Sequence, residues 1–181
     1  AHFPAIDFDA LYTMADGQSV VGLIAAGFEH LEDMKVTKQQ VLPFMKKVFS
    51  LEGRNVSMNR FIAKIAKQMY DEGIELALVK GQGIAQCYAR PLWRSAGDVD
   101  FLLDKENYQK AKALLIPIAV NTEREDIDRR HIGLTIDDWV VELHGTLRSN
   151  LSYRINDTTD SIQEDLFSHK RLRHWQNDTV D

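Results

Sequence analysis

Two aspartates separated by one residue, Asp98 and Asp100, have the spacing that a metal-dependent reaction needs. Val99, Phe101 and Leu103 alternate with polar positions, which predicts a strand with both carboxylates on one face, about 6.5–7 Å apart along the backbone. Two negative charges held so close repel each other unless a cation lies between them. Oxygen ligands of this kind favour Mg²⁺ or Mn²⁺. An Asp-x-Asp pair is also common on protein surfaces, so the pair alone leaves a plain surface strand as the alternative.

Glu142 adds a third carboxylate from a distant part of the chain. It lies in the sequence Val-Val-Glu-Leu-His, where a charged side chain is costly unless it is paired or bound. Three acids on neighbouring strands suit a two-metal site for phosphoryl or nucleotidyl transfer. The alternative is a buried network in which this carboxylate pairs with Arg94, His131 or His144. Imidazoles near carboxylates are more often hydrogen-bond donors around a metal site than ligands, so both histidines are predicted to surround the acids.

The sequence Lys80-Gly81-Gln82 is a candidate phosphate-binding element. A glycine between a strand and a helix lets backbone amides approach a phosphate, and the start of a helix favours anions. Lys80 adds a positive charge, although the spacing fits neither a Walker loop nor a dinucleotide-binding fingerprint. Arg94, just ahead of the acids, is predicted either to hold a triphosphate or to orient a carboxylate.

The elements that position these residues are predicted to alternate between strands and helices from Ile74 onward. A short apolar run ends directly before Lys80, and a strand with alternating side chains follows the first helix. Asp104 is expected to cap the next helix, and Pro117 to end it. The strands are predicted at residues 76–79 and 98–103, and the capped helix at 105–116.

Two further strands, 131–136 and 139–146, are predicted to form a hairpin around Asp137-Asp138. A two-residue turn fixes the register of the pair. Apolar residues then face one another on one side of the hairpin, and on the other side Gly133 faces Glu142 and His131 faces His144. The apolar pairs are Ile136 with Trp139, Leu134 with Val141, and Ile132 with Leu143.

The flanking regions are predicted to be helical. Before the strands, one helix is expected to end ahead of Gly53 and another to begin at Ser57. Near the end of the chain, Ser161 and Glu164 form a capping-box pattern that predicts the start of a last helix. The predicted division is a helical N-terminal region over 1–73, a catalytic core over 74–150, and a C-terminal helical extension over 151–181 that the natural protein is expected to continue.

Composition narrows the classes of protein. The chain has 181 residues with a formal net charge of −5, which argues against a general nucleic-acid binder. Its single cysteine, Cys87, excludes a disulfide framework and a thiolate-cluster zinc site, and is predicted to be buried and inert. No apolar run long enough to span a membrane and no signal peptide are visible, which predicts no membrane association and a cytoplasmic location.

Several short motifs occur in a fixed order between Ile74 and Leu147. They are Leu78-Val79-Lys80-Gly81, Tyr88-Ala89-Arg90-Pro91, Arg94, Gly97-Asp98-Val99-Asp100-Phe101-Leu102-Leu103 and Val141-Glu142-Leu143-His144. The ordered set resembles the uncharacterised nucleotidyltransferase family of the DNA polymerase beta superfamily, although each motif alone is unspecific.

This resemblance implies an α/β (α+β) fold with a polymerase-beta-like nucleotidyltransferase core, in which helices pack on a small mixed sheet and an N-terminal helical segment is added. It implies Asp98 and Asp100 as ligands of two ions and Glu142 as the third carboxylate. The superfamily's usual Gly-Ser after the first strand is replaced here by Lys80-Gly81-Gln82. Nucleotide binding must therefore differ in detail, or has been lost.

The leading hypothesis is metal-dependent transfer of a nucleoside monophosphate from an NTP such as ATP to an acceptor hydroxyl on a small molecule, a protein or an RNA. The cofactor is Mg²⁺ or Mn²⁺. One alternative is a catalytically inactive nucleotide-sensing or partner-binding module on the same scaffold, and another is a metal-dependent phosphohydrolase with both histidines as ligands. The predicted catalytic and metal-binding residues are Asp98, Asp100 and Glu142, the predicted nucleotide-binding residues are Lys80, Gly81, Gln82 and Arg94, and the predicted surrounding residues are His131 and His144.

Overall fold

The computed structural model describes residues 6–31, 36–168 and 171–180. The chain divides into two compact units, one formed by residues 1–57 with 84–96 and the other by residues 58–83 with 97–181. A single long helix, α3 (Lys38–Asp71), contributes residues to both units. The sequence-based boundaries after residues 73 and 150 stay a prediction.

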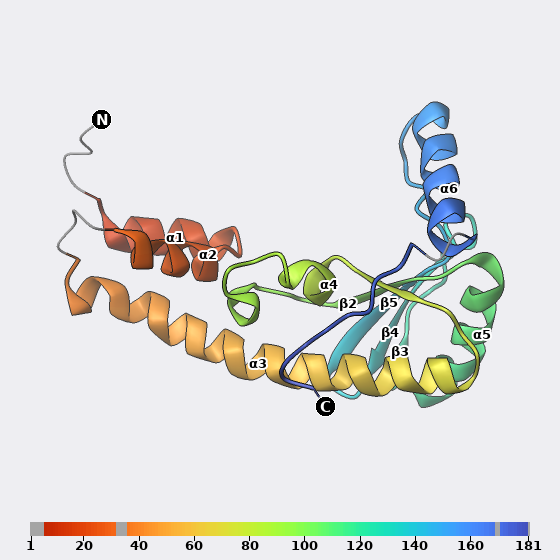
Figure 1. The fold of residues 1–181 in the computed structure, drawn as a ribbon, viewed down its shortest axis with the longest axis horizontal. Coiled ribbons are helices and arrows are strands. Elements are labelled where there is room, and N and C mark those ends of the chain that lie inside the picture. Colours follow the sequence, from red (N-terminus) through yellow and green to blue (C-terminus); the bar gives the residue numbers. More distant parts are fainter. Residues whose placement is uncertain (1–5, 32–35, 169–170, 181) are drawn as a thin grey trace. The chain divides into compact units, whose positions relative to one another are not determined.

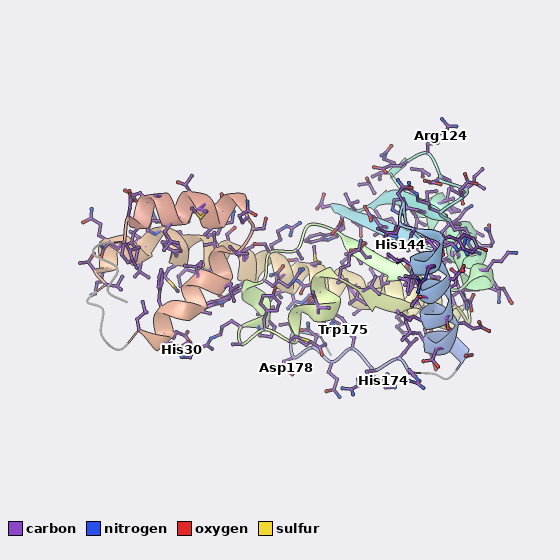
Figure 2. All side chains as sticks on the ribbon, turned by 90° about the horizontal axis from the view of Figure 1, so that it is seen from above. His30, Arg124, His144, His174, Trp175 and Asp178 are labelled. Atoms are coloured by element: carbon purple, nitrogen blue, oxygen red, sulfur yellow. The ribbon has the colours of Figure 1, made fainter. Side chains whose placement is uncertain are left out.

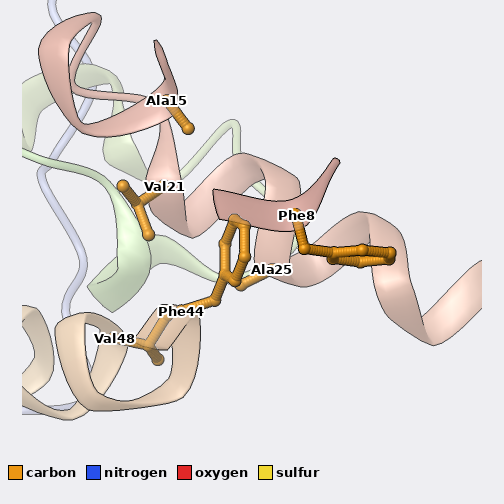
Figure 3. Packing of buried hydrophobic residues seen from close by; sticks show 6 residues of the cluster. All are labelled: Phe8, Ala15, Val21, Ala25, Phe44 and Val48. Atoms are coloured by element: carbon orange, nitrogen blue, oxygen red, sulfur yellow. The ribbon is translucent and has the colours of Figure 1, made fainter. Parts of the chain in front are cut away.

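The first unit is helical and has its own apolar core. Helices α1 (Phe8–Gly17) and α2 (Val21–Gly27) pack with the first half of α3, and short 3-10 helices lie at η1 (Phe28–His30) and η2 (Pro91–Trp93). The Asp7 carboxylate caps α1 by accepting the backbone N–H groups of the first turn. The buried side chains of this core (Figure 3) are Phe8, Ala15, Val21, Ala25, Phe44 and Val48.

Helix α3 corrects the prediction of two separate helices. Gly53 lies inside the helix instead of ending it, and the Ser57 hydroxyl donates to the Gly53 carbonyl at 3.1 Å instead of capping a new helix. A glycine in a helix costs about 1 kcal/mol relative to alanine. Buried apolar residues both before and after Gly53, such as Val48 and Met58, offset that cost because both packed stretches need one continuous helix.

The second unit is built on a mixed sheet, as the family resemblance implies (Figure 1), and the sheet has five strands. The strand order is β1-β2-β5-β4-β3, in which β2 and β5 are parallel and the other neighbours are antiparallel. The last of these strands, β3, is two residues long and was not predicted. The bounds are β1 Ala77–Val79, β2 Val99–Leu102, β3 Asn121–Thr122, β4 His131–Ile136 and β5 Trp139–His144.

The predicted hairpin and its register are confirmed. Strands β4 and β5 pair with Gly133 opposite Glu142 and His131 opposite His144. The common two-residue hairpin turns need a positive φ at their first central residue. Asp137 occupies that position with φ of 51°. The parallel pairing of β5 with β2 then sets Asp100 directly beside Glu142.

Helices cover the apolar face of the sheet. Residues 58–71 of α3 bury Met58, Ile62 and Ile65, and Phe61 meets the Trp139 ring at 6.2 Å between centroids. Helix α5 (Lys105–Leu115) packs beside β5 (Figure 1), and the Asp104 carboxylate caps it as predicted. The 3-10 helix η3 (Ile116–Ile118) follows it.

The last helix is longer than predicted. Helix α6 runs over Tyr153–Ser168, so Ser161 and Glu164 lie in its middle and form no capping box at its start. From α6, the Gln163 amide donates to the carbonyls of Leu103 and Gly145 at 3.0 and 3.3 Å. These contacts hold the chain where it leaves β2 and β5.

Two further sequence predictions concern exposure. Cys87 is exposed, which corrects the prediction of a buried thiol: α4 (Gly81–Ala85) ends before it, so no helix face carries it into a core. Within the described residues, no helix combines the length and apolar character needed to cross a membrane.

The close packing at Gly145 gives a test of this architecture. A Cβ atom at this position would lie 2.7 Å from the Cβ of Arg130 and 2.8 Å from the Cγ of Tyr108, and neither atom is the free end of a flexible side chain. We therefore expect Gly145→Ala to lower the free energy of unfolding by about 1–3 kcal/mol. At Gly97 an added Cβ would meet nothing within 4 Å, so Gly97→Ala is the matched control, expected to change stability by less than about 0.5 kcal/mol. Urea unfolding of both variants measures the difference, and equal stabilities would contradict the packing described.

Candidate functional site

The three predicted acids converge on one face of the sheet. Asp98 directly precedes β2, Asp100 lies within it, and Glu142 lies beside Asp100 on β5. One carboxylate oxygen from each residue lies within 4.8 Å of the others. Residues far apart in the sequence thus meet because β2 and β5 are parallel neighbours in the sheet.

Asp100 is the buried member of this group. Its side chain is 0% exposed because β2 is covered along its whole length. Burial alone would raise the pKa of this carboxyl, but hydrogen bonds from His144 and Lys80 outweigh that effect and hold the pKa below its usual range. Asp100 therefore stays ionised inside the protein.

One oxygen of Asp100 has unused capacity. Oδ1 meets the ammonium of Lys80 and lies 2.9 Å from Nε2 of His144. Oδ2 is buried, and none of the described residues offers it a hydrogen bond. An unpaired buried carboxylate oxygen is costly, and this one belongs to a group that holds two other acids. The donor set therefore fits a hard divalent cation, for which carboxylate oxygens are the preferred ligands.

Lys80 takes a position that the sequence did not predict. Val79 is the β1 partner of Asp100, so the next residue emerges beside the acids. Lys80 itself adopts a left-handed backbone conformation with φ of 53°. This conformation costs a non-glycine residue on the order of 1 kcal/mol. It directs the ammonium to Asp100 and to within 3.9 Å of Glu142 Oε2.

The surroundings of Lys80 show why this arrangement is stable. Partial burial lowers the pKa of its ammonium, but the hydrogen bond to Asp100 and the nearby charges of Asp100, Glu142 and Asp98 raise it overall. The lysine side chain remains 60% exposed, so one side of the ammonium still faces solvent. Lys80 is therefore a built-in cation at the edge of the acidic group.

The two histidines lie next to Glu142, and His144 also contacts Asp100. Nε2 of His131 and Nε2 of His144 are each 3.3 Å from Glu142 Oε2, and the two rings are 4.8 Å apart between centroids. Figure 2 labels His144 on the sheet. These ring nitrogens and the Glu142 oxygen form a second group of potential metal ligands that shares Glu142 with the first.

The remaining predicted residues of the loop after β1 are buried. Gly81 and Gln82 open the short helix α4, and the backbone carbonyl of Gln82 accepts a hydrogen bond from Trp175 Nε1 at 3.2 Å. Gly83 packs α4 tightly on β1, because a Cβ there would lie 2.5 Å from the Leu78 carbonyl oxygen. A helix of five residues contributes little dipole, so anion binding here would depend on Lys80.

Arg94 belongs to the other compact unit. Its guanidinium donates to the Ser95 carbonyl at 3.1 Å and lies 5.8 Å from the centroid of the Tyr88 ring. Its backbone carbonyl accepts from the buried Asn55 amide at 2.8 Å. Its predicted role toward a triphosphate or a carboxylate stays a prediction.

A cavity of about 480 Å³ lies beneath α6, away from the acids. Its lining mixes charges of both signs, for example Lys105 and Arg130 with Asp160 and Glu164, so it does not select an anionic substrate. None of the three clustered acids lines it. Geometry and donor chemistry thus favour the sheet face over this cavity as the functional site.

Comparison with curated proteins and with solved structures gave no significant match. A match to a protein family covers residues 4–178, which is nearly the whole chain and includes both compact units. That family is described as uncharacterised nucleotidyltransferase. Such enzymes act on nucleoside triphosphates and generally use divalent metal ions, in agreement with the clustered acids. The sheet, the acidic group and this match together make the chain a member of the uncharacterised nucleotidyltransferase family.

Proposed function

We propose that this chain transfers a nucleoside monophosphate from an NTP to an acceptor hydroxyl, using Mg²⁺ or Mn²⁺ held by Asp98, Asp100 and Glu142. In this reaction the acceptor oxygen bonds to the α-phosphorus while the bond to the bridging oxygen breaks. Pyrophosphate leaves with the electron pair, and the hydroxyl proton passes to solvent. The observation that carries the proposal is the buried, unpaired Oδ2 of Asp100 within a group of three carboxylates.

The three acids have different roles in this proposal. Bound divalent ions lower the pKa of an attacking hydroxyl and stabilise charge on the phosphate. Asp100 is positioned by β2 and by its contact to His144, which leaves Oδ2 for an ion. Asp98 and Glu142 are less buried and remain accessible to an incoming ion or substrate.

Lys80 is suited to the phosphates of the nucleotide. Its ammonium has an exposed side, and a lysine acts toward phosphate as a compact point charge. It replaces the serine contact that the superfamily makes after the first strand. The acceptor hydroxyl can belong to a small molecule, a protein or an RNA, since nothing in the acidic group distinguishes among these three classes.

Neutral variants of the two accessible acids test the catalytic proposal. We expect Asp98→Asn and Glu142→Gln each to reduce pyrophosphate release from NTPs by at least about 100-fold, because each removes charge that holds the metal. Asp138→Asn, an equal charge change in the exposed hairpin turn, should keep full activity. The assay supplies each of the four NTPs with Mg²⁺ or Mn²⁺ and mixed acceptors. Metal-dependent release that is the same in all variants would overturn the assignment.

A second candidate function is a nucleotide-sensing module without catalysis. The observation that favours it is the Lys80 ammonium, which contacts Asp100 and approaches Glu142, where an ion would also bind. A cation supplied by the chain can stabilise the acids without any metal. The two functions therefore differ in whether a divalent ion displaces Lys80 from Asp100.

Removal of the Lys80 charge distinguishes these cases. Lys80→Met keeps the side-chain length and backbone strain but leaves Asp100 without one partner, so we expect a stability loss of about 1–3 kcal/mol without metal. If metal and lysine compete, Mn²⁺ should raise the melting temperature of the variant more than that of the wild type. Lys64→Met, which breaks an exposed pair with Asp137, is the control and should cost less than about 1 kcal/mol with an unchanged response to Mn²⁺. Identical Mn²⁺ responses of Lys80→Met and wild type would show that no competition exists.

A further inference from the structure

We propose that His131, Glu142 and His144 form a second metal site, selective for a transition-metal ion such as Zn²⁺ over Mg²⁺. This site shares the Glu142 carboxylate with the Asp98–Asp100 pair. It adjoins that pair through His144, whose Nε2 lies 2.9 Å from Asp100 Oδ1. The proposal goes beyond nucleotidyl transfer and does not depend on it, because it concerns metal binding alone.

Two of the three separations between ligand atoms fit a tetrahedral ion. In a tetrahedral site with bonds of about 2.0–2.1 Å, ligand atoms lie about 3.3–3.4 Å apart. Both histidine Nε2 atoms lie 3.3 Å from the same Glu142 oxygen. An octahedral Mg²⁺ site with similar bond lengths would instead bring adjacent ligands to about 3.0 Å.

Hydrogen bonding explains these distances less well. Nitrogen–oxygen hydrogen bonds are most often about 2.9–3.0 Å long, as His144 Nε2 and Asp100 Oδ1 are at 2.9 Å. The two 3.3 Å separations are longer, and they converge on one oxygen from two rings. A strand pair places both imidazoles on that oxygen through the register of His131 opposite His144.

The donor types select the ion. Two imidazole nitrogens and one carboxylate suit Zn²⁺ and its neighbours, whereas Mg²⁺ prefers oxygen ligands alone. All three side chains are partly exposed, at 32% for His131, 27% for Glu142 and 20% for His144, so an ion can enter. Three protein ligands leave a coordination position for water or a substrate oxygen.

The neighbouring charges tolerate this binding. His144 must give up its contact with Asp100 when its Nε2 binds an ion, because one nitrogen lone pair cannot serve both. Asp100 then keeps the Lys80 ammonium as its partner. The two groups of ligands thus share Glu142 and meet again at the contact between His144 and Asp100. Asp98 belongs only to the acidic group, and His131 only to the histidine group.

That separation permits a test with two reciprocal variants. Zn²⁺ and Mn²⁺ affinities are measured by isothermal titration in a Cys87→Ser background, which removes the exposed thiol as a competing ligand. We expect His131→Gln to weaken Zn²⁺ binding by at least about tenfold, because loss of a residue that only hydrogen-bonds to a metal ligand already has an effect of that size. The same variant should leave Mn²⁺ binding unchanged. Asp98→Asn should weaken Mn²⁺ binding and leave Zn²⁺ binding unchanged. Glu142→Gln should weaken the binding of both ions.

The controls separate this proposal from the catalytic one. His30→Gln, an exposed histidine in the other unit, should bind Zn²⁺ like the parent chain. Zn²⁺ affinity that is unchanged in His131→Gln, or that is lost equally in Asp98→Asn, would overturn the histidine site. Failure of the catalytic proposal would instead appear as Mn²⁺ binding and pyrophosphate release that do not respond to Asp98→Asn.

A measurement on the chain without the His131 substitution guards against misfolding of the variant. Long-range ¹H–¹⁵N correlation spectra report the ring nitrogens of the chain's six histidines. We expect one equivalent of Zn²⁺ to shift the Nε2 signals of two histidines and to leave the others unchanged. Shifts in no histidine, or equal small shifts in all six, would contradict the proposal.

Discussion

The structure depends on one electrostatic constraint: a buried carboxylate must remain charged beside two other carboxylates. Parallel pairing of β2 with β5 forces Asp100 next to Glu142, and burial of β2 removes solvent from Asp100. A charge in such a place is stable only when it is paired or bound to a cation. The Lys80 contact and the His144 hydrogen bond meet this requirement, and the proposed binding of a divalent ion would meet it as well.

The same constraint accounts for the strained turn after β1. A lysine with φ of 53° is unfavourable by itself, and a glycine would adopt the turn more easily. A glycine, however, would leave Asp100 without its cation. The ion pair therefore offsets the backbone strain, and the turn that a relative with a Gly-Ser sequence would use for phosphate binding is used here first for charge compensation. Under the proposed function, nucleotide and metal binding would be coupled through this one side chain.

Much of this site followed from the sequence, and the failures have physical causes. Period-two alternation around Asp98 and Asp100, and the two-residue turn at Asp137, gave the strands and the hairpin register, because both depend on local geometry. The contact of Lys80 with Asp100 was not predicted, because the antiparallel pairing of β1 with β2 is a long-range contact that no local pattern encodes. The predicted role of Lys80 toward a phosphate stays a prediction. The predicted helix end before Gly53 and helix start at Ser57 were wrong for a related reason. Burial of apolar residues along α3 outweighed the local preferences of these two residues for helix ends.

The position of Glu142 between two groups of ligands has a further physical consequence. A carboxylate can bridge two cations, but the two positive charges repel each other, so a cation on one side weakens binding of the second. Zn²⁺ at the histidines would also draw His144 away from Asp100, which makes Asp100 depend more strongly on Lys80 or on a hard cation. Occupancy of the two groups is therefore expected to be linked through Glu142 and Asp100. By reciprocity, any effect of zinc on the hard-ion affinity must equal the effect of the hard ion on zinc affinity, whether or not the chain turns over a nucleotide.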